Sequence, residues 1–353
     1  RDRIHEILVI DDGEGMERVT FDKALQMSSG TRSNARSGLG KYGQGLPNSS
    51  ISQTKRVEVY TIQSNVILYN YIDLDEIKES GEAYLPDTET VSKIDIPLYT
   101  QGKITPPQTG TIVRWVKPNR VKPKTAKTLV NHIEEIAGRI FRYYINGFTD
   151  KDGIKYKTSI KVHVFDYNGE NFSDDLFLFK NNIKAFDPMF LMERSQMNDL
   201  FPGCNHPTSQ LYEEPIKKSF IVDYQGENVE TEVEIRLSYV KKEEREKFGR
   251  NAGSENFGKK YLYRNLKGTS GYNNISIIRA GREIDSGQFG FITDVSDNRN
   301  RWWSAEVIVE PTIDSIIGLD NKKQIASEIK FIESNEYFDE DVHEIIKWIS
   351  TWL

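Results

Sequence analysis

A carboxylate followed by two glycines stands at the end of an apolar run near the start of the chain. The run is Ile7–Ile10, and it leads into Asp11, Gly13, Gly15 and Met16. A carboxylate at a strand end can accept a hydrogen bond from an exocyclic amine such as that of adenine, and glycines let the backbone approach a flat ring closely. Aspartate and glycine are also favoured in tight turns on any fold, so these residues alone leave both interpretations open.

A second glycine-rich segment could bind phosphate. Gly38, Gly40 and Gly43 have the spacing of a dinucleotide-binding fingerprint, but that fingerprint requires a hydrophobic strand directly before it. The residues before Gly38 are polar, so the context excludes this interpretation. Closely spaced backbone amides that lead into a helix can instead bind an anion. A flexible loop is the simpler alternative, and Lys41 could either contact a phosphate or be solvated.

A threonine at the start of a later strand is the third candidate. Thr111 follows Thr109 and Gly110 and precedes two apolar residues. Threonine is common in strands, so Thr111 has no functional meaning by itself. Its importance depends on the two segments before it.

In this order, the three segments resemble the nucleotide-binding motifs of the GHKL ATPase superfamily, which includes gyrase, heat-shock chaperones, histidine kinases and MutL. The resemblance implies that Asp11 reads the adenine amine of ATP, and that Gly13, Gly15 and Met16 line the base pocket. It also implies that the Thr111 hydroxyl holds the Asp11 carboxylate or a bridging water. The family's phosphate-binding box, G-x-[FY]-G-x-G-[FL], is met here by Gly40, Lys41, Tyr42, Gly43, Gln44, Gly45 and Leu46.

The second half of the chain resembles the transducer domain of gyrase B subunits, MutL and MORC proteins. In those families a loop lysine reaches the terminal phosphate of ATP. The similar segment runs from Gly318 to Gln324. By its spacing, the role of phosphate sensor falls to Lys323, with Lys322 as the rival. A solvated lysine at the start of a helix is the alternative.

The family's first motif has no counterpart in these 353 residues. That motif is a helix with a glutamate that activates water and an asparagine that holds Mg²⁺, and it precedes the strand that carries the aspartate. We therefore expect the general base and the metal ligand to lie upstream of Arg1, in a longer protein. The chain by itself is then expected to be inactive as an ATPase.

Length and composition favour a cytoplasmic protein of two domains. The single cysteine, Cys204, cannot form an internal disulfide, and no apolar run is long enough to span a membrane. The net charge of −6 argues against nucleic-acid binding by the whole surface. One basic stretch is either a nucleic-acid contact or solvated surface, and it contains Lys117, Arg120, Lys122, Lys124 and Lys127.

Hydrophobic patterns predict the elements that position these residues. Residues 7–10 read as a buried strand, 20–27 as a helix capped by Thr20, and 28–52 as a lid loop. A helix with one apolar stripe is expected at 129–144. Further strands are expected at 56–61, 66–74, 111–116, 160–165, 219–224, 229–240, 275–284 and 304–310, and further helices at 322–334 and 339–352.

We therefore expect an α/β (α+β) fold. A GHKL (Bergerat) α/β sandwich would occupy residues 1–167, and a transducer-like domain with the fold of ribosomal small-subunit protein five would occupy 168–353. In the full-length protein, Mg-ATP would close the lid, drive homodimerisation and be hydrolysed, with DNA or a protein as the client. The alternatives are a chaperone-like ATPase and a degenerate interaction module that does not hydrolyse ATP. A histidine kinase is disfavoured, because no phosphoacceptor-histidine helix is evident.

Overall fold

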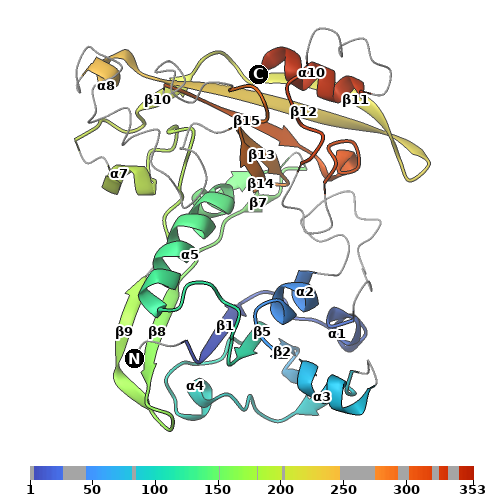
Figure 1. The fold of residues 1–353 in the computed structure, drawn as a ribbon, viewed down its shortest axis with the longest axis vertical. Helices are drawn as coiled ribbons and strands as arrows, with labels where there is room; N and C mark the ends of the chain where they lie inside the picture. The colour runs from blue at the N-terminus through green and yellow to red at the C-terminus, as the bar shows by residue number, and fades with distance from the viewer. Residues whose placement is uncertain are drawn as a thin grey trace. The chain divides into compact units, whose positions relative to one another are not determined.

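The computed structural model describes residues 4–26, 45–81, 85–150, 152–180, 182–200, 203–246, 275–292, 302–319, 326–332 and 342–353. The chain forms two compact units (Figure 1). The first unit consists of Arg1–Ala35, Gly40–His132 and Lys161–Asn181, and the second of Arg36–Leu39, Ile133–Ile160 and Asn182–Leu353. The expected division into domains at residues 167 and 168 stays a prediction.

A five-stranded antiparallel sheet is the centre of the first unit. Ser64 and Asn65 both have positive φ, as in the two-residue turns that join antiparallel strands, and they connect β2 to β3. The strands expected at 56–61, 66–74 and 111–116 are confirmed. In spatial order, the sheet contains β1 (Glu6–Asp11), β5 (Gly110–Val116), β2 (Arg56–Gln63), β3 (Val66–Asp73) and β4 (Glu89–Val91).

The strand β1 is less buried than its aliphatic residues predict. Val9 is 56% exposed and Ile10 is 42% exposed. The reason is its place in the sheet: among the described strands, β1 pairs only with β5 and therefore forms an edge. An apolar run of four residues thus gives an edge strand here, not a strand covered on both faces.

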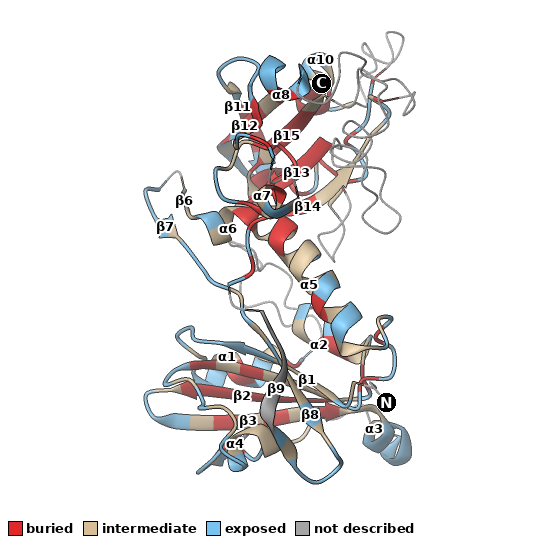
Figure 2. Ribbon diagram, turned by 90° about the vertical axis from the view of Figure 1, so that its left-hand side faces the viewer, coloured by how far each residue is buried: buried red, intermediate tan, exposed pale blue. Residues whose placement is uncertain are grey.

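Three helices cover one face of this sheet. They are α1 (Arg18–Ala24), α2 (Gly45–Ile51) and α3 (Leu74–Ser80). Phe21 and Leu25 pack against Val57 and Val59 of β2, which are fully buried. Most of the length of β2 is buried in the sheet (Figure 2). The expected cap is wrong: Glu17 precedes the first turn of α1, and Thr20 lies inside the helix.

The opposite face carries a second apolar cluster and a row of ion pairs. The cluster contains Tyr60, Ile62 and Ile112, against which α4 (Pro97–Thr100) packs. Arg114 of β5 bridges Glu6 of β1 at 2.6 Å and Glu58 of β2 at 2.9 Å. These half-buried pairs lie across three neighbouring strands and favour their observed register.

A hairpin of β8 (Val162–Tyr167) and β9 (Phe172–Lys180) also belongs to the first unit. The two strands are joined by a turn at Asn168 and Gly169, in which the Asn168 side chain accepts hydrogen bonds from the backbone N–H groups of Glu170 and Asn171. Gln101 of the segment after α4 donates a hydrogen bond to the Glu170 carbonyl oxygen. That bond attaches the hairpin turn to the rest of the unit.

The second unit is built on a six-stranded mixed sheet. Strands β13 and β15 run parallel, and the other pairs are antiparallel. The single strand expected at 275–284 is instead a hairpin, because Ala280 and Gly281 both adopt positive φ. The strands are β10 (Ser209–Leu211), β11 (Ile216–Tyr224), β12 (Glu227–Val240), β13 (Ile275–Arg279), β14 (Arg282–Gly287) and β15 (Trp303–Val309).

One face of this second sheet is apolar. The helix α10 (Glu344–Trp352) packs against it through Ile345, Ile346 and Ile349, which belong to one core cluster with the strands. The C-terminal helix expected at 339–352 is confirmed from Glu344 onward. The helix expected at 322–334 is wrong for residues 326–332, which form an isolated bridge, a turn and irregular chain.

The other face of the second sheet binds a helix through charges. The helix expected at 129–144 is observed as α5 (Ala126–Ile140) and α6 (Arg142–Asn146). Ile136, a member of the apolar stripe, is 40% exposed. The second unit buries Arg139 and Arg142 of these helices. The reason is pairing: both arginines form ion pairs with Glu283 of β14, and Arg142 also pairs with Glu306 of β15.

The remaining elements are short. None of the helices in the described part of the chain combines the length and hydropathy needed to cross a membrane. The short elements are β6 (Phe148–Thr149), β7 (Lys155–Tyr156), α7 (Gln196–Leu200), α8 (Lys242–Glu246) and a 3₁₀ turn at Pro311–Ile313.

Candidate nucleotide site

Asp11 is held in one orientation at the end of β1. Its Oδ1 atom accepts hydrogen bonds from the backbone N–H groups of Gly13, at 3.0 Å, and of Thr111, at 3.2 Å. The residue is exposed, and within the described residues no donor contacts its other carboxylate oxygen, Oδ2. A carboxylate with one oxygen fixed by the protein and the other open can accept a hydrogen bond from a ligand.

The strand register brings Asp11 and Thr111 together. Asp11 of β1 pairs with Thr111 of β5, and Thr111 pairs in turn with Thr61 of β2. Cross-strand partners point to the same face of a sheet, which here is the face covered by α1. The sequence predicts a contact through the Thr111 hydroxyl, whereas the contact observed with Asp11 is made by the Thr111 backbone N–H.

Thr61 is a residue of this site that the sequence does not reveal. Its side chain is completely buried. The Thr61 hydroxyl oxygen accepts a hydrogen bond from the backbone N–H of Met16 at 2.8 Å and donates one to the Gly110 carbonyl oxygen at 3.3 Å. Thr61 thereby joins the Asp11 motif to the Thr111 motif. No sequence signal distinguishes it, because threonine in the middle of a strand is ordinary.

We expect Thr61→Val to weaken both the fold of the first unit and nucleotide binding. The variant keeps the shape of the side chain but leaves the Met16 N–H without its acceptor, which costs about 1–3 kcal/mol. Urea unfolding and ATP titration measure the two effects. Thr61→Ser retains the hydroxyl and serves as the control. If Thr61→Val is as stable as Thr61→Ser, this hydrogen bond does not stabilise the site.

Gly15 and Gly110 let backbone segments touch where no side chain fits. Gly15 has φ +73°, and a Cβ there would lie 2.2 Å from the Ile62 carbonyl oxygen. Gly110 has φ +135°, and a Cβ there would lie 2.0 Å from the Asp11 carbonyl oxygen. The sequence predicts that Gly15 serves the close approach of a flat ring. The structure shows a second reason for glycine at position 15: the backbone of β2 occupies the space that a side chain would need.

Gly45 and Leu46 are the described part of the phosphate-binding box. They begin α2, so a helix does follow the box as expected. Leu46 and Met16 pack against the same apolar cluster, which brings the end of this box near the end of the Asp11 motif. The other predicted phosphate-contacting residues lie outside the described residues; they are Gly40, Lys41, Tyr42, Gly43, Gln44 and, in the second unit, Lys322 and Lys323.

One protein family matches the part of the chain that contains these motifs. The family of histidine kinase-, DNA gyrase B- and HSP90-like ATPases matches residues 1–111, from before the Asp11 strand to Thr111 itself. This part of the chain belongs to the GHKL ATPase superfamily. No curated protein matches the chain. A specific relation to MORC or MutL proteins stays a prediction.

Because residues 1–111 match this ATPase family, they belong to an ATP-binding domain with an α/β sandwich fold. The described residues fit the adenine base. Adenine offers a hydrogen-bond donor at its exocyclic amine, and the open Oδ2 of Asp11 is an acceptor. Asp11, Thr111 and Thr61 are cross-strand neighbours and form one row across the sheet, with Asp11 at its end. Met16 adds an apolar side chain that is only partly buried.

The described residues do not supply a magnesium site. Mg²⁺ is bound through oxygen ligands in an octahedral arrangement, usually including carboxylates. In the part of the chain that the structure describes, no group of three or more His, Cys, Asp or Glu side chains could hold a metal ion.

Proposed function

We propose that Asp11 recognises the adenine of ATP and that the full-length protein is an ATP-driven conformational switch. The observation that supports adenine recognition is the fixed carboxylate at the end of the Asp11–Thr111–Thr61 row. Two backbone N–H groups hold Oδ1, so Oδ2 faces outward as an acceptor. An exocyclic amine satisfies that acceptor, whereas the O6 carbonyl of guanine would oppose it.

The switching part of this proposal rests on the family resemblance. ATP binding closes the lid at residues 28–52, Lys323 senses the terminal phosphate, and hydrolysis releases the closed state. The second unit acts as the transducer, and the closed form is a homodimer. A cytoplasmic location agrees with the single cysteine of the chain.

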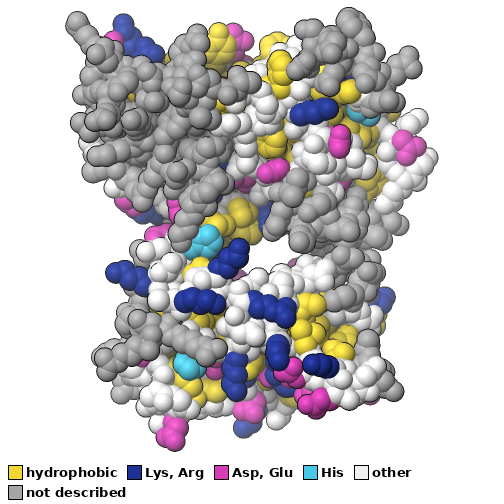
Figure 3. Space-filling view, viewed as in Figure 1, with side chains coloured by type: hydrophobic (Ala, Val, Ile, Leu, Met, Phe, Trp, Pro, Cys, Tyr) yellow, Lys and Arg dark blue, Asp and Glu magenta, His cyan; other side chains and the backbone are white. Residues whose placement is uncertain are grey.

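DNA is the client that the surface charge favours. The basic stretch from Lys117 to Lys127 is exposed at all five of its cationic residues, and Lys and Arg side chains gather on the face of the first unit seen in Figure 3. Arg120 holds its loop against the end of α2 by donating to the Ile51 carbonyl oxygen at 3.1 Å. Such a stretch can contact a phosphate backbone without reading its sequence.

Asp11→Asn is expected to lower ATP affinity by about 10- to 100-fold, the value of one charge-assisted hydrogen bond. The two N–H donors keep the amide oxygen at the Oδ1 position, so the amide NH₂ faces the ligand. It then opposes the adenine amine but can donate to the guanine O6 atom. We therefore expect the preference for ATP over GTP to fall or reverse, and ATP-dependent dimerisation to be lost. Calorimetric titration and light scattering measure these effects on the full-length protein.

Asp12→Asn is the matched control. Asp12 is the exposed neighbour of Asp11, and the substitution changes net charge by the same amount. We expect it to leave ATP and GTP affinity unchanged. Unaltered ATP affinity in Asp11→Asn would contradict the adenine assignment.

A further inference from the structure

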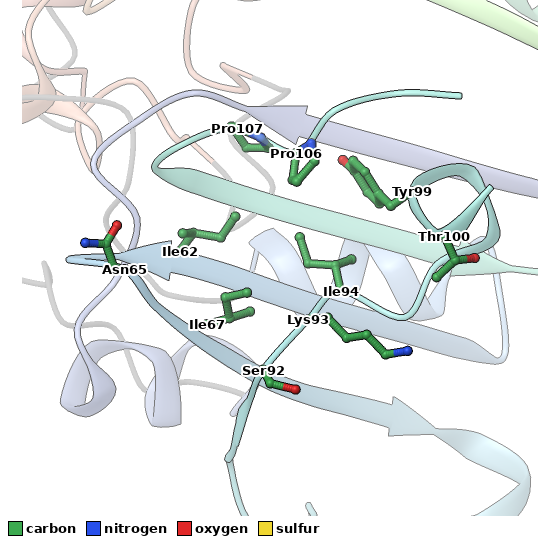
Figure 4. A pocket seen from close by; sticks show the side chains of 10 residues that line it. All are labelled: Ile62, Asn65, Ile67, Ser92, Lys93, Ile94, Tyr99, Thr100, Pro106 and Pro107. Carbon is green, nitrogen blue, oxygen red and sulfur yellow. The ribbon is translucent and has the colours of Figure 1, made fainter. Parts of the chain in front are cut away.

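A pocket lies on the face of the first sheet opposite to the Asp11–Thr111–Thr61 row. Side chains alternate between the faces of a strand, so Ile62 points away from the face that Thr61 occupies. The pocket has a volume of about 490 Å³ (Figure 4). Its lining is formed by Ile62, Asn65, Ile67, Ser92, Lys93, Ile94, Tyr99, Thr100, Pro106 and Pro107.

The size and lining of the pocket match a small organic ligand. Pockets of about 300–1,000 Å³ with apolar walls and a few polar groups are typical of small-molecule sites. Ile62, Ile67 and Ile94 form the apolar centre, and the two prolines close one side (Figure 4). The pocket is lined entirely by residues of the first unit.

The hydroxyl of Tyr99 has no hydrogen-bond partner in the part of the chain that the structure describes. Its oxygen is buried, and among the described residues no group bonds to it. In Figure 4 the hydroxyl points toward Pro106, which has no N–H to offer. Burial raises the pKa of Tyr99 to about 12, so the group is a proton donor at neutral pH. An unpaired buried donor destabilises a fold, and a ligand with an acceptor atom relieves this cost.

Lys93 gives the pocket its charge. It is the one charged residue in the lining, and its side chain is exposed. Within the described residues, no carboxylate lies within ion-pairing distance of its ammonium group. The pocket therefore combines an apolar body with two groups that have no partner among the described residues, a hydroxyl donor and a positive charge at the margin.

We propose that this pocket binds a small organic anion, an apolar molecule that carries a carboxylate or sulfonate group. The apolar body lies against the three isoleucines, the acidic group accepts from Tyr99, and Lys93 at the margin attracts the anion by its charge. The strand β2 separates this ligand from the nucleotide: the side chain of Ile62 faces the pocket, while its carbonyl oxygen contacts Gly15. ATP and the anion can thus be bound at the same time.

The fluorescent sulfonate 8-anilinonaphthalene-1-sulfonate is a suitable probe, titrated into the full chain with and without saturating ATP. We expect saturable binding that ATP does not displace. Ser92→Trp places an indole at the mouth of the pocket and should weaken binding at least tenfold. Lys93→Glu should weaken it about fivefold, in a manner that added salt diminishes. Lys78→Glu, an exposed lysine of α3 with the same change in charge, should have no effect.

Tyr99→Phe separates ligand binding from folding. The variant removes a hydroxyl that no described residue bonds to, so the melting temperature should stay the same or rise, while probe affinity falls about three- to tenfold. Displacement of the probe by ATP would overturn the proposal, because the probe would then occupy the nucleotide site. Unchanged probe affinity in Ser92→Trp, Lys93→Glu and Tyr99→Phe would overturn it as well.

Discussion

Gly110→Ala should lower ATP affinity by more than 100-fold and destabilise the first unit by about 2–5 kcal/mol. An alanine Cβ at this position would lie 2.0 Å from the Asp11 carbonyl oxygen and 2.9 Å from the carbonyl carbon. The φ of +135° is strained for any residue with a side chain, which adds about 1–3 kcal/mol. Relief requires β1 and β5 to separate at this end, and that separation removes the bond from Thr111 N–H to Asp11.

Calorimetric titration with ATP and urea unfolding measure the two effects of Gly110→Ala separately. Gly203→Ala is the control, because no atom of the described residues lies within 4 Å of its expected Cβ. We expect that control to match the wild type in both measurements. Wild-type ATP affinity in Gly110→Ala would show that the close contact between β1 and β5 is not needed for binding.

Arg142→Met should destabilise the second unit by about 3–5 kcal/mol, the cost of leaving buried charge unpaired. Arg142 is completely buried and donates to Glu283 and to Glu306 at 2.5 Å each. Burial alone would raise the pKa of Glu283, but the charges of Arg139 and Arg142 lower it below its ordinary value. Methionine fills the space, so the loss is electrostatic and not one of volume.

Urea unfolding followed by tryptophan fluorescence measures this loss, because four of the five tryptophans lie in the second unit. Lys184→Ala breaks an exposed ion pair with Asp199 in the same unit and is the control, expected to cost less than about 1 kcal/mol. Equal losses in the two variants would mean that the buried cluster contributes no more than a surface pair.

The motifs were predictable because each is local. Asp11, Gly13 and Gly15 follow one apolar run, and Gly110 and Thr111 open another. Strand ends of this kind are recognised from hydrophobic pattern and turn residues, which depend on neighbouring residues in the chain. The structure confirms the strands, and the family match confirms the superfamily.

The buried face of α5 and α6 was not predictable in the same way. Its apolar residues recur at helical spacing, which predicts that they are buried, yet the second unit buries Arg139 and Arg142. A charged residue is buried only where a countercharge compensates the loss of water. Those countercharges, Glu283 and Glu306, stand more than 140 residues further along the chain.

The sequence by itself determined that a GHKL nucleotide-binding domain begins this chain and which strand ends carry its motifs. Only the tertiary structure decided that Thr61 joins those motifs and that neighbouring backbone occupies the space beside Gly15 and Gly110. It also decided that a pocket lies on the opposite face of β2. The physical reason is strand register: it chooses which side chains become neighbours across a sheet, and that choice depends on residues about 50 to 100 positions apart.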